Sequence, residues 1–222
     1  MSKPEPRPRC PSCHRALRTC VCALARPVAH QVEVLILMHS MEVHEAKGTG
    51  HLLHLCLPHS RVMVGEEFDS AELEAALHGR WASRADANAD ADSAPRHSLL
   101  LYPDTAEQDA ALGLAAASPL PLPWPQPPER LRLVVIDGTW RKSRKMLYLN
   151  PLLQALPRLP LVDLPASQYR IRKAQQAHQL SSFEASVAAL VQLHALGGAQ
   201  ADGLQAVFQA WLGAQSGSAP PR

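Results

Sequence analysis

Aromatic residues are scarce in this chain of 222 residues, because Phe, Trp and Tyr together make up only 5% of it. Leu, Val and Ala must therefore fill the hydrophobic core, and apolar residues, at 46% of the sequence, are numerous enough to build one. No apolar run reaches the roughly 18 residues of a membrane span, and the first residues lack the apolar stretch of a signal peptide. We therefore expect a cytoplasmic protein that does not enter a membrane.

Several common active-site motifs are missing as well. The sequence contains no P-loop, no G-x-G-x-x-G and no G-x-S-x-G, and its 11 histidines show no spacing typical of a catalytic metal site. ATP hydrolysis, a standard Rossmann cofactor site and a serine-hydrolase mechanism are therefore not indicated. The formal net charge of +2 identifies no partner by itself.

Cysteines are few and unevenly distributed, since four of the five lie close together near the start of the chain. In a reducing compartment, such a group favours metal binding or free thiols over disulfides. The spacing C-x2-C-x6-C-x-C allows four thiolates to enclose one tetrahedral zinc ion, and the alternative is unligated thiols in a flexible segment. Cys56 lies in an apolar segment and is expected in the core. The four candidate ligands are Cys10, Cys13, Cys20 and Cys22.

Apolar runs alternate with helical segments along the chain. This order predicts an α/β fold with a mostly parallel sheet and flanking helices, because strands buried on both faces are continuously apolar. Strands are expected at residues 32–38, 61–64, 98–103 and 131–137, with a shorter one at 160–164. Helices are expected at 51–57, 70–79, 140–149, 181–196 and 202–212, with another opened by a capping box of Asp104 and Glu107. Residues 81–96 read as a surface insert and 118–128 as a proline-rich connector.

The segment IDGTW lies where the strongest strand meets a basic helix. Ligands bind at the carboxyl ends of strands in such sheets, so Asp137 is the central candidate for accepting a proton or holding a ligand amine. A helix cap or a partner for a neighbouring arginine is the alternative. Gly138 allows a close approach, and Thr139 can cap the following helix. Trp140 is either a core residue, which we favour, or a ring on which a base stacks.

Basic residues are concentrated around this junction. Residues 129–145 hold six cations against two acids, which gives a local net charge of +4. Four of these cations share one side of the helix expected at 140–149, and such a face suits nucleic-acid phosphates, although a solvated helix surface is the alternative. A second group lies at residues 168–173. The six cations are Arg130, Arg132, Arg141, Lys142, Arg144 and Lys145, and the second group includes Tyr169, Arg170, Arg172 and Lys173.

Ser181 and Glu184 have the spacing of a capping box at the start of a helix. The free N–H groups of that helix terminus can also bind an anion, and the two roles are compatible. His39 follows the first strand without an obvious partner, which is most often a structural arrangement.

Together, these motifs resemble the DTW-domain family, named for D-x-T-W. The chain supplies this signature in IDGTWRKSRKML, preceded by RCPSCHRALRTCVC, ILMHSMEVHEAKGTGHLL and LLLYP and followed by SQYRIRKAQQAHQLSSFEA. The resemblance extends from about residue 10 to residue 190. The chain departs from the family pattern at Ser40, where Pro is usual, at Val43 and His44, where a basic residue is frequent, and at Ser182, where Thr is usual.

The resemblance implies a tRNA-uridine aminocarboxypropyltransferase. Such enzymes move the 3-amino-3-carboxypropyl group of S-adenosylmethionine to N3 of a uridine, which for bacterial members lies in the variable loop. The resemblance also implies a SPOUT-like fold with a C-terminal trefoil knot. The expected organisation is a zinc-binding segment at residues 1–27, a catalytic domain at 28–213 and a disordered tail at 214–222. An RNA methyltransferase of the same fold and a noncatalytic zinc-containing RNA-binding protein remain the alternatives.

The resemblance also assigns roles to residues. Asp137 is expected to act on the uridine proton or to orient the substrate. The cofactor pocket is expected to include Leu101, Tyr102, Asp137, Gly138, Thr139, Trp140, Tyr169, Ser181, Ser182 and Glu184. Contacts to tRNA are expected from His39, Arg141, Lys142, Arg144, Lys145, Arg170, Arg172 and Lys173.

Overall fold

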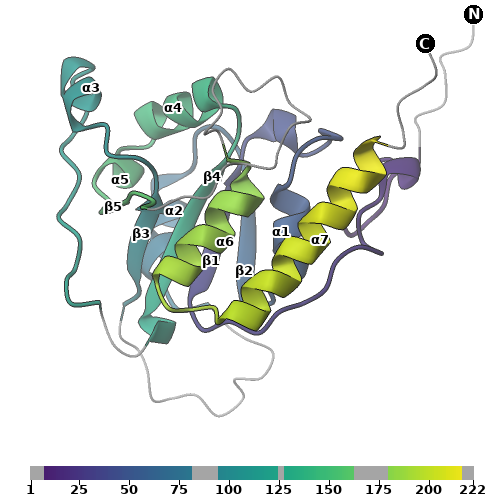
Figure 1. Ribbon diagram of the computed structural model, residues 1–222. Helices are drawn as coiled ribbons and strands as arrows, with labels where there is room; N and C mark the ends of the chain where they lie inside the picture. Colours follow the sequence, from purple (N-terminus) through teal and green to yellow (C-terminus); the bar gives the residue numbers. More distant parts are fainter. Residues whose placement is uncertain (1–7, 82–94, 125–127, 163–179, 217–222) are drawn as a thin grey trace, which may run out of the picture.

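A five-stranded parallel sheet with the order β2-β1-β4-β3-β5 forms the centre of the fold (Figure 1). The computed structural model describes residues 8–81, 95–124, 128–162 and 180–216. The strands are β1 Glu33–Met38, β2 Ser60–Val64, β3 His97–Leu101, β4 Leu131–Asp137 and β5 Arg158–Leu159.

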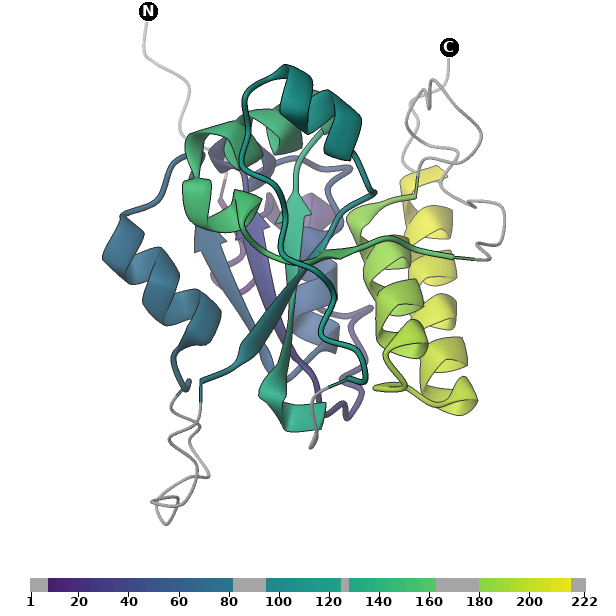
Figure 2. The same cartoon turned by 90° about the vertical axis from the view of Figure 1, so that its left-hand side faces the viewer.

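Helices cover both faces of the sheet, so the protein has three layers (Figure 2). One face carries α1 Gly50–Cys56, α6 Ser182–Gln192 and α7 Gly198–Ser216. The other carries α2 Ser70–His78, α4 Trp140–Leu149 and α5 Pro151–Gln154. The remaining elements are α3 Ala106–Ala111 and the 3-10 turns η1 Leu17–Thr19, η2 Ser40–Glu42 and η3 Pro128–Arg130.

The central strand β4 shows why residues 133–136 are continuously apolar. All seven of its residues are buried, and successive side chains alternate between the two cores. Leu133 and Val135 pack in the core below α1, α6 and α7, whereas Val134 and Ile136 pack against α2, α4 and α5. The predicted parallel α/β sheet with flanking helices is therefore confirmed.

Two local predictions were wrong. The last strand comprises Arg158–Leu159, and the predicted stretch starting at Pro160 is not a strand within the described residues. Proline has no N–H for a ladder hydrogen bond, which fits an end of pairing at this position. The capping box at the start of α3 does not form, because Thr105 is the N-cap and the Asp104 carboxylate accepts instead from the backbone N–H of Ala106 (3.1 Å).

The C-terminal helices also differ from the predicted lengths. Helix α6 ends at Gln192, and α7 begins at Gly198 and continues to Ser216, so 214–216 belong to a helix and not to a tail. Most of the predicted insert at 81–96, and the segment 163–179, lie outside the described residues. In the parts that are described, no helix combines the length and apolar character needed to cross a membrane.

Candidate active site at the carboxyl edge of the sheet

Asp137 occupies the carboxyl end of the central strand and is only 5% exposed. Its Oδ1 accepts a hydrogen bond of 2.6 Å from Ser182 Oγ in the first turn of α6. Its backbone carbonyl accepts from the N–H of His39, which follows the neighbouring strand β1 (3.0 Å). The carboxylate is thus fixed between elements that are distant in sequence.

Gly50 brings the start of α1 against the same carboxylate. A Cβ atom at this position would lie 2.8 Å from Asp137 Cγ and 2.8 Å from Met38 Cε, closer than real side chains approach. Only glycine therefore fits here while the carboxylate keeps its place. Gly50 belongs to the segment ILMHSMEVHEAKGTGHLL that the family resemblance includes, but the sequence does not show which residue Gly50 contacts.

His39 is 4% exposed and organises the loop beside the site. The backbone N–H of Met41 donates to its Nδ1 (3.1 Å), so Nε2 carries the proton and donates to Glu66 Oε1 (2.9 Å). Lys145 of α4 also donates to Glu66 (2.7 Å), and the hydrogen bonds from Lys145 and His39 lower the pKa of this carboxyl below its usual value. This geometry fits a positioning role for His39 better than a direct contact with RNA.

Glu42 and Lys142 form a second bridge to α4. The Glu42 carboxylate is 4% exposed and accepts from Lys142 Nζ at 2.8 Å. Gly138 lies beneath this bridge, where an added Cβ would come within 3.2 Å of Lys142 Cβ. The two ion pairs attach the first turns of α4 to the loops after β1 and β2. Thr139 caps the helix as predicted, accepting from the Lys142 N–H (3.4 Å).

Trp140 is not a core residue, contrary to our sequence-based preference. Its side chain is 47% exposed, and its ring stacks on Tyr102, with centroids 5.2 Å apart and an angle of 17° between the planes. Tyr102 follows β3 and is buried, which raises the pKa of its phenol. The indole is therefore held in place by a buried ring and is still available for a stacking ligand.

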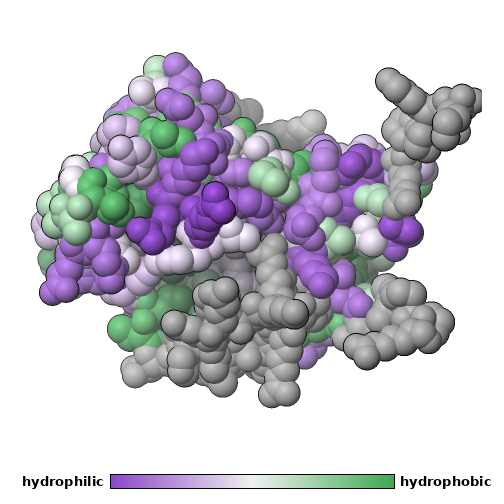
Figure 3. All heavy atoms as spheres, turned by 90° about the horizontal axis from the view of Figure 1, so that it is seen from above, coloured by the Kyte–Doolittle hydropathy of each residue, from purple (hydrophilic) through white to green (hydrophobic). Residues whose placement is uncertain are grey.

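The cations of α4 fall into two classes. Lys142 and Lys145 are engaged in the ion pairs with Glu42 and Glu66. Arg141 and Arg144 are exposed and form no ion pair with any described residue. Figure 3, which views this end of the molecule from above, shows hydrophilic side chains gathered over α4. The exposed arginines are the part of the basic cluster that can reach a phosphate.

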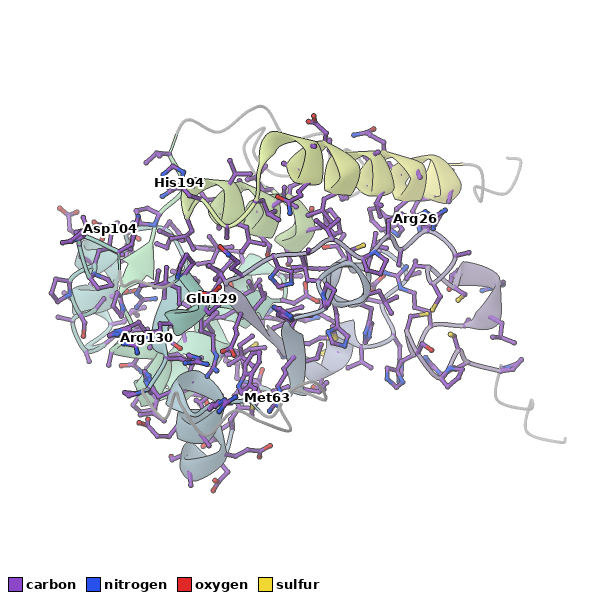
Figure 4. The ribbon with its side chains drawn as sticks, turned by 90° about the horizontal axis from the view of Figure 1, so that it is seen from below. Arg26, Met63, Asp104, Glu129, Arg130 and His194 are labelled. Carbon is purple, nitrogen blue, oxygen red and sulfur yellow. The ribbon has the colours of Figure 1, made fainter. Side chains whose placement is uncertain are left out.

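The other two cations of the predicted cluster point elsewhere. Arg132 is fully buried in β4, where it pairs with Glu33 of β1. Arg130 belongs to η3, directly before β4, and Figure 4, seen from below, labels it to the left of Glu129. The cationic surface near Asp137 is therefore smaller than the net charge of residues 129–145 suggested.

The capping box at the start of α6 is confirmed. Ser181 Oγ accepts from the Glu184 N–H (3.2 Å), and the Glu184 carboxylate accepts from the Ser181 N–H (2.9 Å). This places Ser182 at the first helical position, facing Asp137. Leu101 ends β3 and packs partly buried against the core. The other predicted site residues, Tyr169, Arg170, Arg172 and Lys173, lie outside the described residues.

Glu42, Gly50, Glu66 and Arg158 are site-lining residues that sequence reasoning did not single out. Glu42 and Gly50 stood within a recognised motif, but their partners are on other elements. Glu66 carried no signal, because an isolated charged residue after a strand is common on protein surfaces. Arg158, whose guanidinium lies 5.2 Å from the centroid of the Tyr102 ring, carried none because it begins a strand of only two residues.

The four predicted zinc ligands converge in the N-terminal segment. Their sulfur atoms all lie within 4.8 Å of one another, with 3.6 Å between Cys10 and Cys22 and 3.7 Å between Cys13 and Cys20. A tetrahedral zinc site with bonds of about 2.3 Å has sulfur atoms about 3.8 Å apart, so this arrangement fits the metal. Backbone N–H groups of Cys13 and Ser12 lower the pKa of the Cys10 thiol to about 6, whereas burial raises the pKa of the Cys22 thiol, so only the first shift favours the thiolate that a metal binds.

Arg15 connects this cysteine cluster to the site. Its side chain is 1% exposed and donates to the backbone carbonyls of Ala46 (3.0 Å) and Gly48. These residues belong to the loop that leads to Gly50 and hence to the Asp137 carboxylate. The cysteine segment therefore supports this loop through Arg15.

Together, the fold and the site define an α/β protein with a buried carboxylate at the carboxyl edge of a parallel sheet, beside an exposed aromatic ring and a cationic helix. The sequence model of the DTW domain matches residues 7–216, nearly the whole chain. The chain belongs to the DTW domain family. No solved structure shows a significant similarity to it.

Curated relatives share one name, tRNA-uridine aminocarboxypropyltransferase 2. The mouse protein (Mus musculus) is 29% identical over 191 residues, the macaque protein (Macaca fascicularis) 26% over 186, and the fly protein (Drosophila melanogaster) 27% over 194. The matches include 83–86% of this chain. The chain spans 56% of the length of the two mammalian relatives and 68% of the fly relative.

Proposed function

We propose that this protein transfers the 3-amino-3-carboxypropyl group of S-adenosylmethionine to N3 of a tRNA uridine in the variable loop. The observation that carries the proposal is the buried Asp137 carboxylate, fixed at the sheet edge beside an exposed aromatic ring and two exposed arginines. Membership in the DTW domain family and the name of the curated relatives support it.

Asp137 is the proposed proton acceptor. Uridine N3 is a weak acid that must lose its proton before it attacks a carbon, and a positioned carboxylate can take that proton. The hydrogen bond from Ser182 stabilises the ionised carboxylate, and Gly50, which has no side chain, leaves room for the carboxylate against the start of α1. S-adenosylmethionine supplies the electrophile: the N3–C bond forms as the C–S bond breaks, and the sulfonium leaves as neutral methylthioadenosine.

The remaining site residues bind and orient in this proposal. Trp140 stacks on a base or on adenine, with Tyr102 as its support. The N-terminal turn of α6 and residues 101–102 line the cofactor pocket, together with Tyr169. Arg141 and Arg144 hold RNA phosphates, and the target uridine leaves its stack to reach the carboxylate. Arg170, Arg172 and Lys173 are proposed to extend this contact.

Two features beyond the chemistry belong to the same proposal. Zinc bound by the four cysteines would hold the N-terminal segment together and, through Arg15, the loop of Gly50. A SPOUT-like fold with a C-terminal knot belongs to the proposal through the family resemblance alone, since residues 163–179, which join β5 to α6, lie outside the described residues. The cytoplasm is the proposed compartment.

A double-label experiment tests the activity. The protein is incubated with unmodified bulk tRNA and with S-adenosylmethionine labelled either in the aminocarboxypropyl carbons or in the methyl group. The proposal expects label in tRNA from the first preparation only. Label only from the second would identify a methyltransferase, and label from neither, with tRNA still bound, would identify a noncatalytic RNA-binding protein.

A further inference from the structure

A pocket of about 380 Å³ lies beyond the carboxyl ends of β3 and β5, beside the proposed active site. Its volume falls within the range of small-molecule sites. Figure 4 labels Asp104, which lines this pocket, on the opposite side of the molecule from Arg26, which follows the cysteine segment, so the pocket is separate from the metal cluster. Its polar lining residues are Asp104, Thr105, Asp109, Ser118 and Arg158.

Arg158 is the unusual residue of this lining. Its side chain is only 7% exposed, and Nη2 donates to Asp109 Oδ2 at 3.3 Å. Its Nε and Nη1 are buried and form no hydrogen bond with any described residue. Buried N–H groups of a cation are costly to leave without acceptors, so such groups call for a ligand or a water molecule.

Two carboxylates complement this cation. Asp109 accepts from Thr105 Oγ1 (2.9 Å) and from Arg158, and Asp104 accepts from a backbone N–H at the start of α3. One cation and two anions give the lining a net charge of −1. A pocket that offers both signs at once matches the α-carboxylate and α-ammonium of an amino acid, and its net charge favours a ligand with one further positive charge.

The pocket is connected to the proposed active site through stacked side chains. The Arg158 guanidinium lies over the Tyr102 ring at 5.2 Å from its centroid, and the same ring supports Trp140. In the sheet, β5 is two strand spacings from β4, about 10 Å. A ligand of the length of S-adenosylmethionine can therefore touch both.

We propose that this pocket binds the amino-acid end of S-adenosylmethionine, with Arg158 holding the carboxylate and Asp104 and Asp109 holding the ammonium group. The inference rests on the proposed function and specifies its donor site. Anchoring the amino-acid end fixes the aminocarboxypropyl chain relative to the acceptor. This anchoring selects that chain over the methyl group as the group transferred, because the choice depends on which carbon is held in line with the nucleophile.

Calorimetric binding of three ligands tests the assignment without a requirement for turnover. S-adenosylmethionine carries both charged groups, decarboxylated S-adenosylmethionine lacks the carboxylate, and methylthioadenosine lacks the whole amino-acid chain. We expect Arg158→Gln to weaken S-adenosylmethionine binding about 10- to 100-fold and to leave the other two ligands within about threefold. Asp109→Asn should weaken both ligands that carry the ammonium group and spare methylthioadenosine. Arg26→Gln, which changes an exposed arginine on the opposite side of the molecule from Asp104, is the matched control.

Each contrary result has a distinct meaning. If Arg158→Gln weakens all three ligands equally, Arg158 acts only on structure, and the subsite is overturned. If the unmodified protein binds S-adenosylmethionine no more tightly than the decarboxylated form, the carboxylate contact does not exist, although the proposed function stands. If the unmodified protein binds none of the three, the proposed function fails and the subsite with it.

Discussion

The two ends of strand β4 place opposite charges in opposite environments. At the amino end, Arg132 is fully buried, and its guanidinium donates to Glu33 and to the backbone carbonyls of Ala76 (2.6 Å) and Gly79 (2.8 Å). Its guanidinium also lies 4.0 Å from the centroid of the Trp81 ring. At the carboxyl end, Asp137 is almost as buried but lies beside the exposed ring of Trp140 and the exposed arginines of α4.

This difference separates a structural charge from a candidate catalytic one. Burial lowers the pKa of Arg132, and Glu33 opposes that effect, so the pair is balanced within the fold. The surroundings of Asp137 instead hold it in one orientation from two sides, through Ser182 and Gly50. A fully buried and paired charge such as Arg132 stabilises the fold, whereas an oriented charge beside an exposed surface, such as Asp137, can act on a ligand.

Replacing Asp137 at the carboxyl end of β4 should have the largest effect, and this effect should be on turnover. Asp137→Asn keeps the shape of the side chain but removes the proton acceptor, so turnover should fall by a factor of about 10² to 10⁴ while tRNA binding and the unfolding midpoint stay close to normal. Turnover is measured by release of methylthioadenosine. Unchanged turnover would exclude Asp137 from proton transfer. Ser182→Ala should cause a smaller loss.

Replacing Arg132 at the amino end of β4 should change stability instead. Arg132→Met removes one of the two cationic partners of Glu33, since Arg96 is the other, and it leaves the carbonyls of Ala76 and Gly79 without their donor. It should therefore lower the free energy of unfolding by about 3–5 kcal/mol. Urea denaturation provides the measurement. Arg144→Met on the exposed side of α4 is the control and should change stability by less than about 0.5 kcal/mol. Equal effects of the two substitutions would contradict the distinction between the two ends.

Gly50→Ala tests the close packing around Asp137. The added methyl group must displace the carboxylate or α1, so we expect a loss of about 1–3 kcal/mol in stability together with lower turnover. Gly203→Ala in α7 is the matched control, because a Cβ added there meets no atom within 4 Å, and it should be neutral or stabilising by up to about 1 kcal/mol. A fully active, stable Gly50→Ala protein would show that the contact is not needed.

The exposed arginines should affect RNA binding alone. Replacing both Arg141 and Arg144 by Gln should weaken binding to all tRNAs and reduce the slope of log affinity against log salt by about 1 for each lost phosphate contact. Filter binding at several salt concentrations measures this slope. Arg130→Gln at the other end of β4 should leave it unchanged. An unaltered slope in the double variant would place the RNA site elsewhere.

A smaller effect is expected from His30, a buried histidine that precedes strand β1. Burial lowers the pKa of His30, which donates through Nδ1 to the Val32 carbonyl and accepts at Nε2 from the His59 N–H. The unfolded chain therefore binds more protons below the ordinary pKa of 6.5, and stability should fall as pH drops below that value. His30→Asn should flatten this dependence in thermal unfolding between pH 7.5 and 5.0, and an unchanged slope would contradict the assignment.

Much of the framework could be predicted from local pattern. Continuous apolar runs identified four of the five strands because strands buried on both faces must be apolar throughout, and β5 was missed because a strand of two residues carries no such pattern. The capping box at Ser181 and the cap at Thr139 were also readable, since each depends on residues three positions apart. The cysteine spacing led to the cluster for the same reason.

The sequence by itself determined a parallel α/β sheet, a carboxylate at its edge and a set of cysteines able to meet. Tertiary structure alone decided what surrounds that carboxylate: the bond from Ser182 spans 45 residues, and the bridge from Lys142 to Glu42 spans 100. It also exposed Trp140, because Tyr102 at the end of the adjacent strand supports its ring, and it buried Arg132 against Trp81. Periodicity reports only which side of an element is apolar, whereas the partner of each side chain depends on how distant elements pack.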